Sequence, residues 1–89
     1  MTMRKDPDAK LDFAVDWTQW LANEGDTASE FNWMVPEGLT GSDEQVDGGK
    51  AVIWLSGGEV GADYRVTCRI TTASGRVNDA TLEISVRDR

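Results

Sequence analysis

The sequence has no histidine and only one cysteine among its 89 residues. A lone cysteine cannot form an internal disulfide, and without histidine a catalytic thiol lacks its usual acid–base partner. Cys68 falls within an alternating apolar row, so we expect a small buried side chain there and not a nucleophile. These absences argue against cysteine-based catalysis and against a domain held together by disulfides.

Long hydrophobic runs and an excess of positive charge are absent too. No run approaches the length of a membrane span, and residues 1–8 lack the apolar region of a signal peptide, so we expect the chain to be made in the cytoplasm and to bind no membrane. Lysine and arginine number 9 against 16 acidic residues, a net charge of −7. Because phosphate binding needs a basic face, this charge argues against nucleic acid as a partner.

Motifs for metal, phosphate or acid–base chemistry are weak. Asp43, Glu44 and Asp47 offer the oxygen ligands that calcium takes, but their spacing does not match an EF-hand. Residues 48–50, Gly-Gly-Lys, lack the upstream glycine and the following hydroxyl residue of a phosphate loop. The remaining acidic residues fall mostly in turns and on polar strand faces. We therefore predict no catalytic residue, no metal and no cofactor.

What the sequence does contain is alternation with a period of two, clearest over residues 63–86. Apolar side chains occupy every second position of two segments: Tyr64, Val66, Cys68, Ile70, then Ala80, Leu82, Ile84, Val86. A three-residue loop, Ala73 to Gly75, would put Gly75 in the left-handed conformation that such a hairpin needs. The pattern predicts two antiparallel strands, each with one buried face.

The hairpin register follows from this loop. It pairs Thr72 with Arg76 and sets Cys68 opposite Ala80 on the buried side. On the solvent side it sets opposite charges face to face, namely Arg65 with Glu83 and Arg69 with Asp79. We expect most of the positive charge on these strands to be neutralised within the hairpin.

Three further segments read as strands, at residues 11–17, about 29–35 and 50–55. Residues 36–49 read as a long connection, with a short edge strand around 39–46. In the third segment we favour Ala51, Ile53 and Leu55 inward, with Trp54 partly exposed. Tyr64 is placed to tie its hydroxyl back to the loop before it, as in immunoglobulin-class sandwiches. The fold class predicted is all-β, an immunoglobulin-like antiparallel β-sandwich of about 6–7 strands.

Residues 1–9 are polar and read as a flexible N-terminal arm with no part in the core, and residues 10–88 as the sandwich domain. The alternation breaks at residues 17–21, where Trp20 and Leu21 either close the open end of the core or form an interaction site. Aromatic side chains that a core cannot absorb are typical interface anchors. The candidate partner-binding residues are Trp17, Trp20, Leu21 and Trp54.

Several phrases resemble a family of small structural proteins from tailed bacteriophages, of the fiber–tail adaptor or head–tail type. They extend from about Lys5 to Val86, and comprise Lys5-Asp-Pro-Asp-Ala9, Leu11-Asp-Phe13, Asp16-Trp17, Trp20-Leu21, Trp33-Met-Val-Pro36, Gly38-Leu-Thr40, Ala51-Val-Ile-Trp-Leu-Ser-Gly-Gly58, Tyr64-Arg-Val-Thr-Cys-Arg-Ile-Thr-Thr72 and Gly75-Arg76. The resemblance implies an immunoglobulin-like module, present in several copies in a virion, that joins tail, connector or fiber proteins. It carries over no site residues.

Three hypotheses follow, and none of them is an enzyme. The first is a virion adaptor that docks through the arm, the 17–21 corner or a sheet edge. The second is a capsid decoration protein, which would be far more abundant in particles. The third is a carbohydrate-binding module, which would need exposed aromatic side chains in a row, with Trp20 and Trp54 as the candidates.

Overall fold

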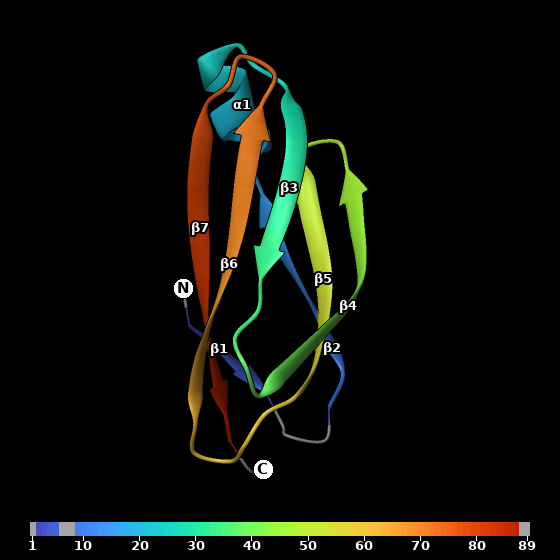
Figure 1. The fold of residues 1–89 in the computed structure, drawn as a ribbon, viewed down its shortest axis with the longest axis vertical. Coiled ribbons are helices and arrows are strands. Elements are labelled where there is room, and N and C mark those ends of the chain that lie inside the picture. The colour runs from blue at the N-terminus through green and yellow to red at the C-terminus, as the bar shows by residue number, and fades with distance from the viewer. Residues whose placement is uncertain (1, 6–8, 88–89) are drawn as a thin grey trace.

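The computed structural model describes residues 2–5 and 9–87. In this part of the chain seven strands and one short helix are formed: β1 Thr2–Lys5, β2 Leu11–Asp16, α1 Thr18–Glu24, β3 Ala28–Met34, β4 Leu39–Asp47, β5 Lys50–Gly57, β6 Asp63–Thr72 and β7 Val77–Val86 (Figure 1). The helix lies at the end of the molecule where β6 turns into β7. The all-β prediction, with 6–7 strands, is confirmed.

The strands form two packed sheets, one in the order β1-β7-β6-β3 and the other in the order β2-β5-β4. All pairings are antiparallel except the parallel pair β1 with β7. With β2 to β7 taken as strands B to G, the pairings B-E-D and G-F-C are those of a constant-type immunoglobulin sandwich. The predicted β-sandwich is therefore the observed architecture.

The hairpin of β6 and β7 has the predicted register. Cys68 lies opposite Ala80, Arg69 opposite Asp79 and Arg65 opposite Glu83. The Thr72 amide donates to the Arg76 carbonyl at 2.8 Å, and Gly75 has a φ of 93°, which closes the three-residue loop. Parity fixes this register because a slip of one residue would turn a buried row to water.

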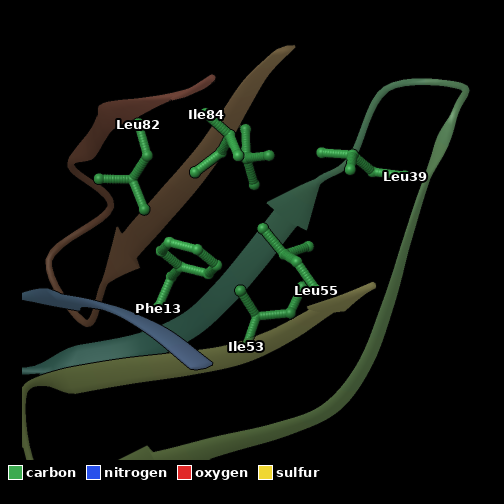
Figure 2. Close-up of a cluster of buried hydrophobic side chains, with 7 residues drawn as sticks. Phe13, Leu39, Ile53, Leu55, Leu82 and Ile84 are labelled. Atoms are coloured by element: carbon green, nitrogen blue, oxygen red, sulfur yellow. The ribbon is translucent and has the colours of Figure 1, made fainter. Parts of the chain in front are cut away.

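The main core lies between the two sheets, where apolar side chains from both inner faces meet (Figure 2). Ala51, Ile53 and Leu55 are buried and Trp54 is half-buried, so the predicted orientation of β5 is confirmed. Seven buried residues make up this cluster, Phe13, Leu39, Ile53, Leu55, Val66, Leu82 and Ile84. Leu11, which lies on the same side of β2 as Phe13, is 39% exposed at the first residue of the strand.

Tyr64 packs against this core and reaches the preceding loop. Its hydroxyl accepts a hydrogen bond from the Glu59 amide at 3.0 Å. The expected tie between this tyrosine and the loop backbone is therefore present.

The predicted free arm is wrong for residues 2–5. These residues form β1, which runs parallel to β7 from Glu83 to Val86. Lys5 is only 1% exposed, its ammonium donates to the Gly57 carbonyl at 2.7 Å, and its own carbonyl accepts from Arg87 at 2.9 Å. Polarity did not exclude a strand here because backbone pairing needs no apolar side chain, and a lysine stem can be buried when its head finds an acceptor. Residues 1, 6–8 and 88 of the predicted arm and domain lie outside the described residues.

The edge strand expected around residues 39–46, within the connection over residues 36–49, is confirmed as β4. β4 has nine residues and forms an edge of its sheet, paired with β5. The register shifts between Ser42 and Gln45, and Asp43 has a φ of 51°. A bulge of this kind twists an edge strand and hinders uncontrolled pairing with other chains.

Candidate partner-binding surfaces

The helix α1 closes one end of the sandwich. Its apolar residues Trp17, Trp20 and Leu21 recur at helical spacing and so share a face. The Asp16 carboxylate accepts from the Thr18 amide at 2.9 Å at the start, and Gly25, with a φ of 61°, ends the helix. This spacing explains why strand alternation stops at residue 17.

The apolar face of α1 covers a second core cluster. Trp17 and Leu21 are 6% and 8% exposed and pack with Ile70, while Trp20 is half-buried at the margin. The rings of Trp17 and Trp20 meet edge to face with centroids 5.5 Å apart. The predicted closure of the core by Trp20 and Leu21 is confirmed. Since Trp17 and Leu21 are buried, Trp20 is the most accessible of these three side chains.

Polar contacts fix α1 to the hairpin turn. Glu24 forms an ion pair with Arg76, and Asp26 accepts a hydrogen bond from the Ser74 hydroxyl. The bonds from Ser74 and then Thr72 lower the pKa of Asp26 to about 2. Arg76, the third arginine of the hairpin, is therefore also paired.

We use the name hairpin face for the solvent-facing side of β6 and β7. Its charges are paired across the strands: Arg69 donates to both oxygens of Asp79 at 2.8 and 3.0 Å, Arg65 lies 3.4 Å from Glu83 and Arg87 lies 3.1 Å from Asp63. Hydrogen bonding from Arg69 lowers the pKa of Asp79, and hydrogen bonding from Ser85 lowers that of Asp63. The predicted internal neutralisation is confirmed. A hollow on this face is lined by Asp63, Tyr64, Arg65, Glu83 and Ser85.

The Trp54 face is the solvent-facing side of the sheet β2-β5-β4. Directly paired residues point to the same side, so Trp54 is flanked by Asp12 on β2 and Ser42 on β4. One step along, Val52 is flanked by Ala14 and Gln45 in the same way. Trp54, Val52 and Ala14 are each half-buried and together form a short apolar strip on this face.

Lys10 crosses the Trp54 face from one edge of the sheet to the other. It immediately precedes β2, and its ammonium lies 3.0 Å from the Asp43 carboxylate in the bulge of β4. The same ammonium lies 5.9 Å from the centroid of the Trp54 ring, which is within cation–π range. Neither Lys10 nor Asp43 was singled out as a partner-binding residue, because their contact depends on the register of two strands far apart in sequence.

The structure does not bring Trp20 and Trp54 together. The chain enters α1 beside the start of β5, where the Trp17 amide donates to the Gly49 carbonyl at 2.8 Å. Trp54 lies four residues along β5 from Lys50, which is about 13 Å at the usual rise of a strand. The indoles of Trp20 and Trp54 therefore belong to separate surfaces and form no continuous aromatic row.

Cys68 is fully buried, and burial raises the pKa of its thiol. It has the place of a small core side chain, as predicted. Within residues 2–5 and 9–87 no cluster of three or more histidine, cysteine, aspartate or glutamate side chains has the arrangement of a metal site. No helix in the same residues is long and apolar enough to cross a membrane.

The fold and these surfaces define an all-β sandwich whose accessible features are two sheet faces and a capped end. Residues 5–85 match a family model described as podophage GP4 fiber-tail adaptor protein gp77. No curated protein was found to match. The match covers nearly the whole chain, so the protein belongs to this family of phage fiber-tail adaptor proteins, and the resemblance drawn from the sequence is confirmed.

Proposed function

We propose that the protein is a non-enzymatic component of the virion, an immunoglobulin-like adaptor that joins tail, connector or fiber proteins. The observation that carries this function is the family match over residues 5–85, which coincides with the sandwich. The protein would be assembled in the host cytoplasm and be present in several copies in the particle.

The distribution of charged and apolar side chains on the surface supports a role as a structural part of an assembled particle. The hairpin face is occupied by its own ion pairs, whereas the Trp54 face carries an indole and an apolar strip. Half-buried aromatic side chains in such a position are typical anchors of protein interfaces. Of the four predicted partner-binding residues, Trp54 and Trp20 are the ones that would touch a partner directly. Trp17 and Leu21 would act by holding α1, and thereby Trp20, in place.

The test is to produce phage particles without this protein and to examine them by electron microscopy. An adaptor predicts particles with filled heads that lack fibers or part of the tail, and addition of purified protein should restore them. Normal fibers on particles without the protein would contradict the proposed function.

Copy number separates the adaptor from a capsid decoration protein. Quantitative mass spectrometry of purified virions should give a number comparable to that of tail or fiber subunits. A number comparable to that of the capsid subunit would favour decoration of the shell. The carbohydrate-binding hypothesis gains nothing from the placement of Trp20 and Trp54, since sugar chains are bound on aromatic side chains that lie in a row.

A further inference from the structure

We propose that the Trp54 face is the docking site for a cationic segment of a tail or fiber protein, with an arginine of that segment stacked on Trp54 in the place now taken by Lys10. This inference rests on the proposed function and specifies the surface and the chemistry of the partner.

The contact of Lys10 indicates what the Trp54 ring accepts. Its ammonium is held 5.9 Å from the ring centroid by an ion pair with Asp43. Both side chains remain about half exposed or more, 51% and 62%, so the pair is solvated and easily exchanged. The planar guanidinium of arginine stacks on an indole and is more weakly hydrated than an ammonium, so an incoming arginine would be the better occupant.

The charge of the Trp54 face favours the same partner. In the described residues it carries two cations, Lys10 and Lys50, against four acids, Asp12, Asp16, Asp43 and Asp47. Asp12, directly beside Trp54, and Asp47 form no ion pair within these residues. A guanidinium over Trp54 would lie between Asp12 on one edge strand and Asp43 on the other. The hairpin face offers no comparable excess, because three ion pairs already balance it.

The apolar strip supplies the remaining contact. Val52 and Ala14 lie next to Trp54 along the sheet and are half-buried. The aliphatic stem of an arginine, or an apolar neighbour of it, can cover them while the charged head meets the acids. A sheet face with a central indole and acidic margins therefore suits an extended basic segment better than a neutral one.

The partner can be identified by photo-crosslinking in the particle. Benzoylphenylalanine placed at Trp54 should crosslink to a tail or fiber protein, in a peptide that contains arginine. The matched control is the same residue at Thr67, which lies on the hairpin face paired with Thr81. Crosslinking from position 67 and none from position 54 would overturn the inference. So would a peptide at position 54 that contains no basic residue.

Binding can be measured with radiolabelled protein and particles assembled without it. Trp54→Ala should weaken binding by roughly tenfold or more. Asp12→Lys should weaken it as well, whereas Glu30→Lys, the same charge change on the outer side of β3, should not. Thermal unfolding of each variant checks that the fold is kept. Equal losses for Asp12→Lys and Glu30→Lys would show that overall charge, and not this face, governs binding.

Lys10→Ala tests whether the partner's arginine replaces Lys10 on the Trp54 ring. Removing the internal competitor should strengthen binding about two- to fivefold. A loss as large as that of Trp54→Ala would mean that Lys10 is itself a partner contact, and would overturn the exchange. If the unaltered protein does not bind these particles, the proposed function fails. If it binds and Trp54→Ala binds equally well, only the docking site is refuted.

Discussion

The two outer faces of the sandwich use charge in different ways. On the hairpin face, cations and acids lie opposite each other on neighbouring strands, as in the two-oxygen contact of Arg69 with Asp79. On the Trp54 face the acids outnumber the cations, and Asp12 lies beside an indole without an ion-pair partner in the described residues. The charged side chains of the hairpin face are therefore paired with one another, whereas the Trp54 face has acidic side chains without an ion-pair partner in the described residues.

The charge difference between the two faces indicates which face would give a partner more binding free energy. Docking on the hairpin face would require desolvation of several ion pairs that gain nothing in exchange. Docking a basic segment on the Trp54 face would supply the missing charge and cover apolar surface at once. The two faces would therefore differ in how well they bind a basic segment, although both face solvent.

The largest effect should come from the inner side of the same strand that carries Trp54. Ile53→Ala removes a side chain that is 1% exposed between the sheets and should lower the free energy of unfolding by about 2–5 kcal/mol. Trp54→Ala, one residue further on, should cost less than about 1 kcal/mol. Urea unfolding of both variants measures the contrast. A larger loss for Trp54→Ala would show that Trp54 serves the fold more than an interface.

The next largest effect should be a loss of stability in acid, where hydrogen-bonded and ion-paired carboxylates become protonated. The pKa of Asp26 is lowered to about 2 from 3.8, and those of Asp79 and Asp63 are lowered too. Their contribution to stability is present above the unfolded pKa of 3.8 and is lost as the pH falls below it, for Asp26 as the pH approaches 2, since the unfolded state binds more protons in this range. Unfolding across this range should show a shallower pH dependence for Asp26→Asn and for Asp79→Asn. Unchanged slopes would contradict the role assigned to these carboxylates.

A smaller effect is expected from the Arg69–Asp79 pair, because both side chains are more than 40% exposed. Arg69→Asp puts two acids opposite each other and should lower the melting temperature slightly. Exchange of the two residues, Arg69→Asp with Asp79→Arg, should restore most of that loss. Failure of the exchange to restore it would mean that the pair is not the source of the effect.

The smallest effect on stability should follow from Lys10→Ala. Its ion pair with Asp43 is solvated, so the melting temperature should stay within error of the parent. The Trp54 ring should become more accessible to acrylamide, measured in a background where Trp20 and Trp33 are replaced by phenylalanine, so that only the buried Trp17 remains beside Trp54. Unchanged quenching would show that Lys10 does not cover the ring.

Much of the fold could be predicted from the sequence because alternation and turn chemistry agree. The hairpin register followed from parity, from Gly75 and from the facing charges of Arg65 and Glu83. β1 could not be predicted in this way. Its residues have no apolar row, and its place depends on a free stretch of β7 and on the Gly57 carbonyl that receives Lys5.

The candidate surface was only partly predictable. The parity of β5 placed Trp54 outward, but the bridge from Lys10 to Asp43 joins residues 33 positions apart and depends on the bulge in β4. The break in alternation at residues 17–21 indicated a closure of the core or an interaction site but did not separate the buried Trp17 from the half-buried Trp20. That distinction depends on the packing of α1 against Ile70.

The most direct test compares oxidation of Trp54 with oxidation of Met34 by hydroxyl radicals, in the free protein and in the virion. Trp54 lies on the outer side of the sheet β2-β5-β4, whereas Met34, which is 37% exposed, lies on the outer side of β3 in the opposite sheet. If the Trp54 face is the docking site, Trp54 should be protected in the particle while Met34 is oxidised as in the free protein. Protection of Met34 with continued oxidation of Trp54 would contradict it.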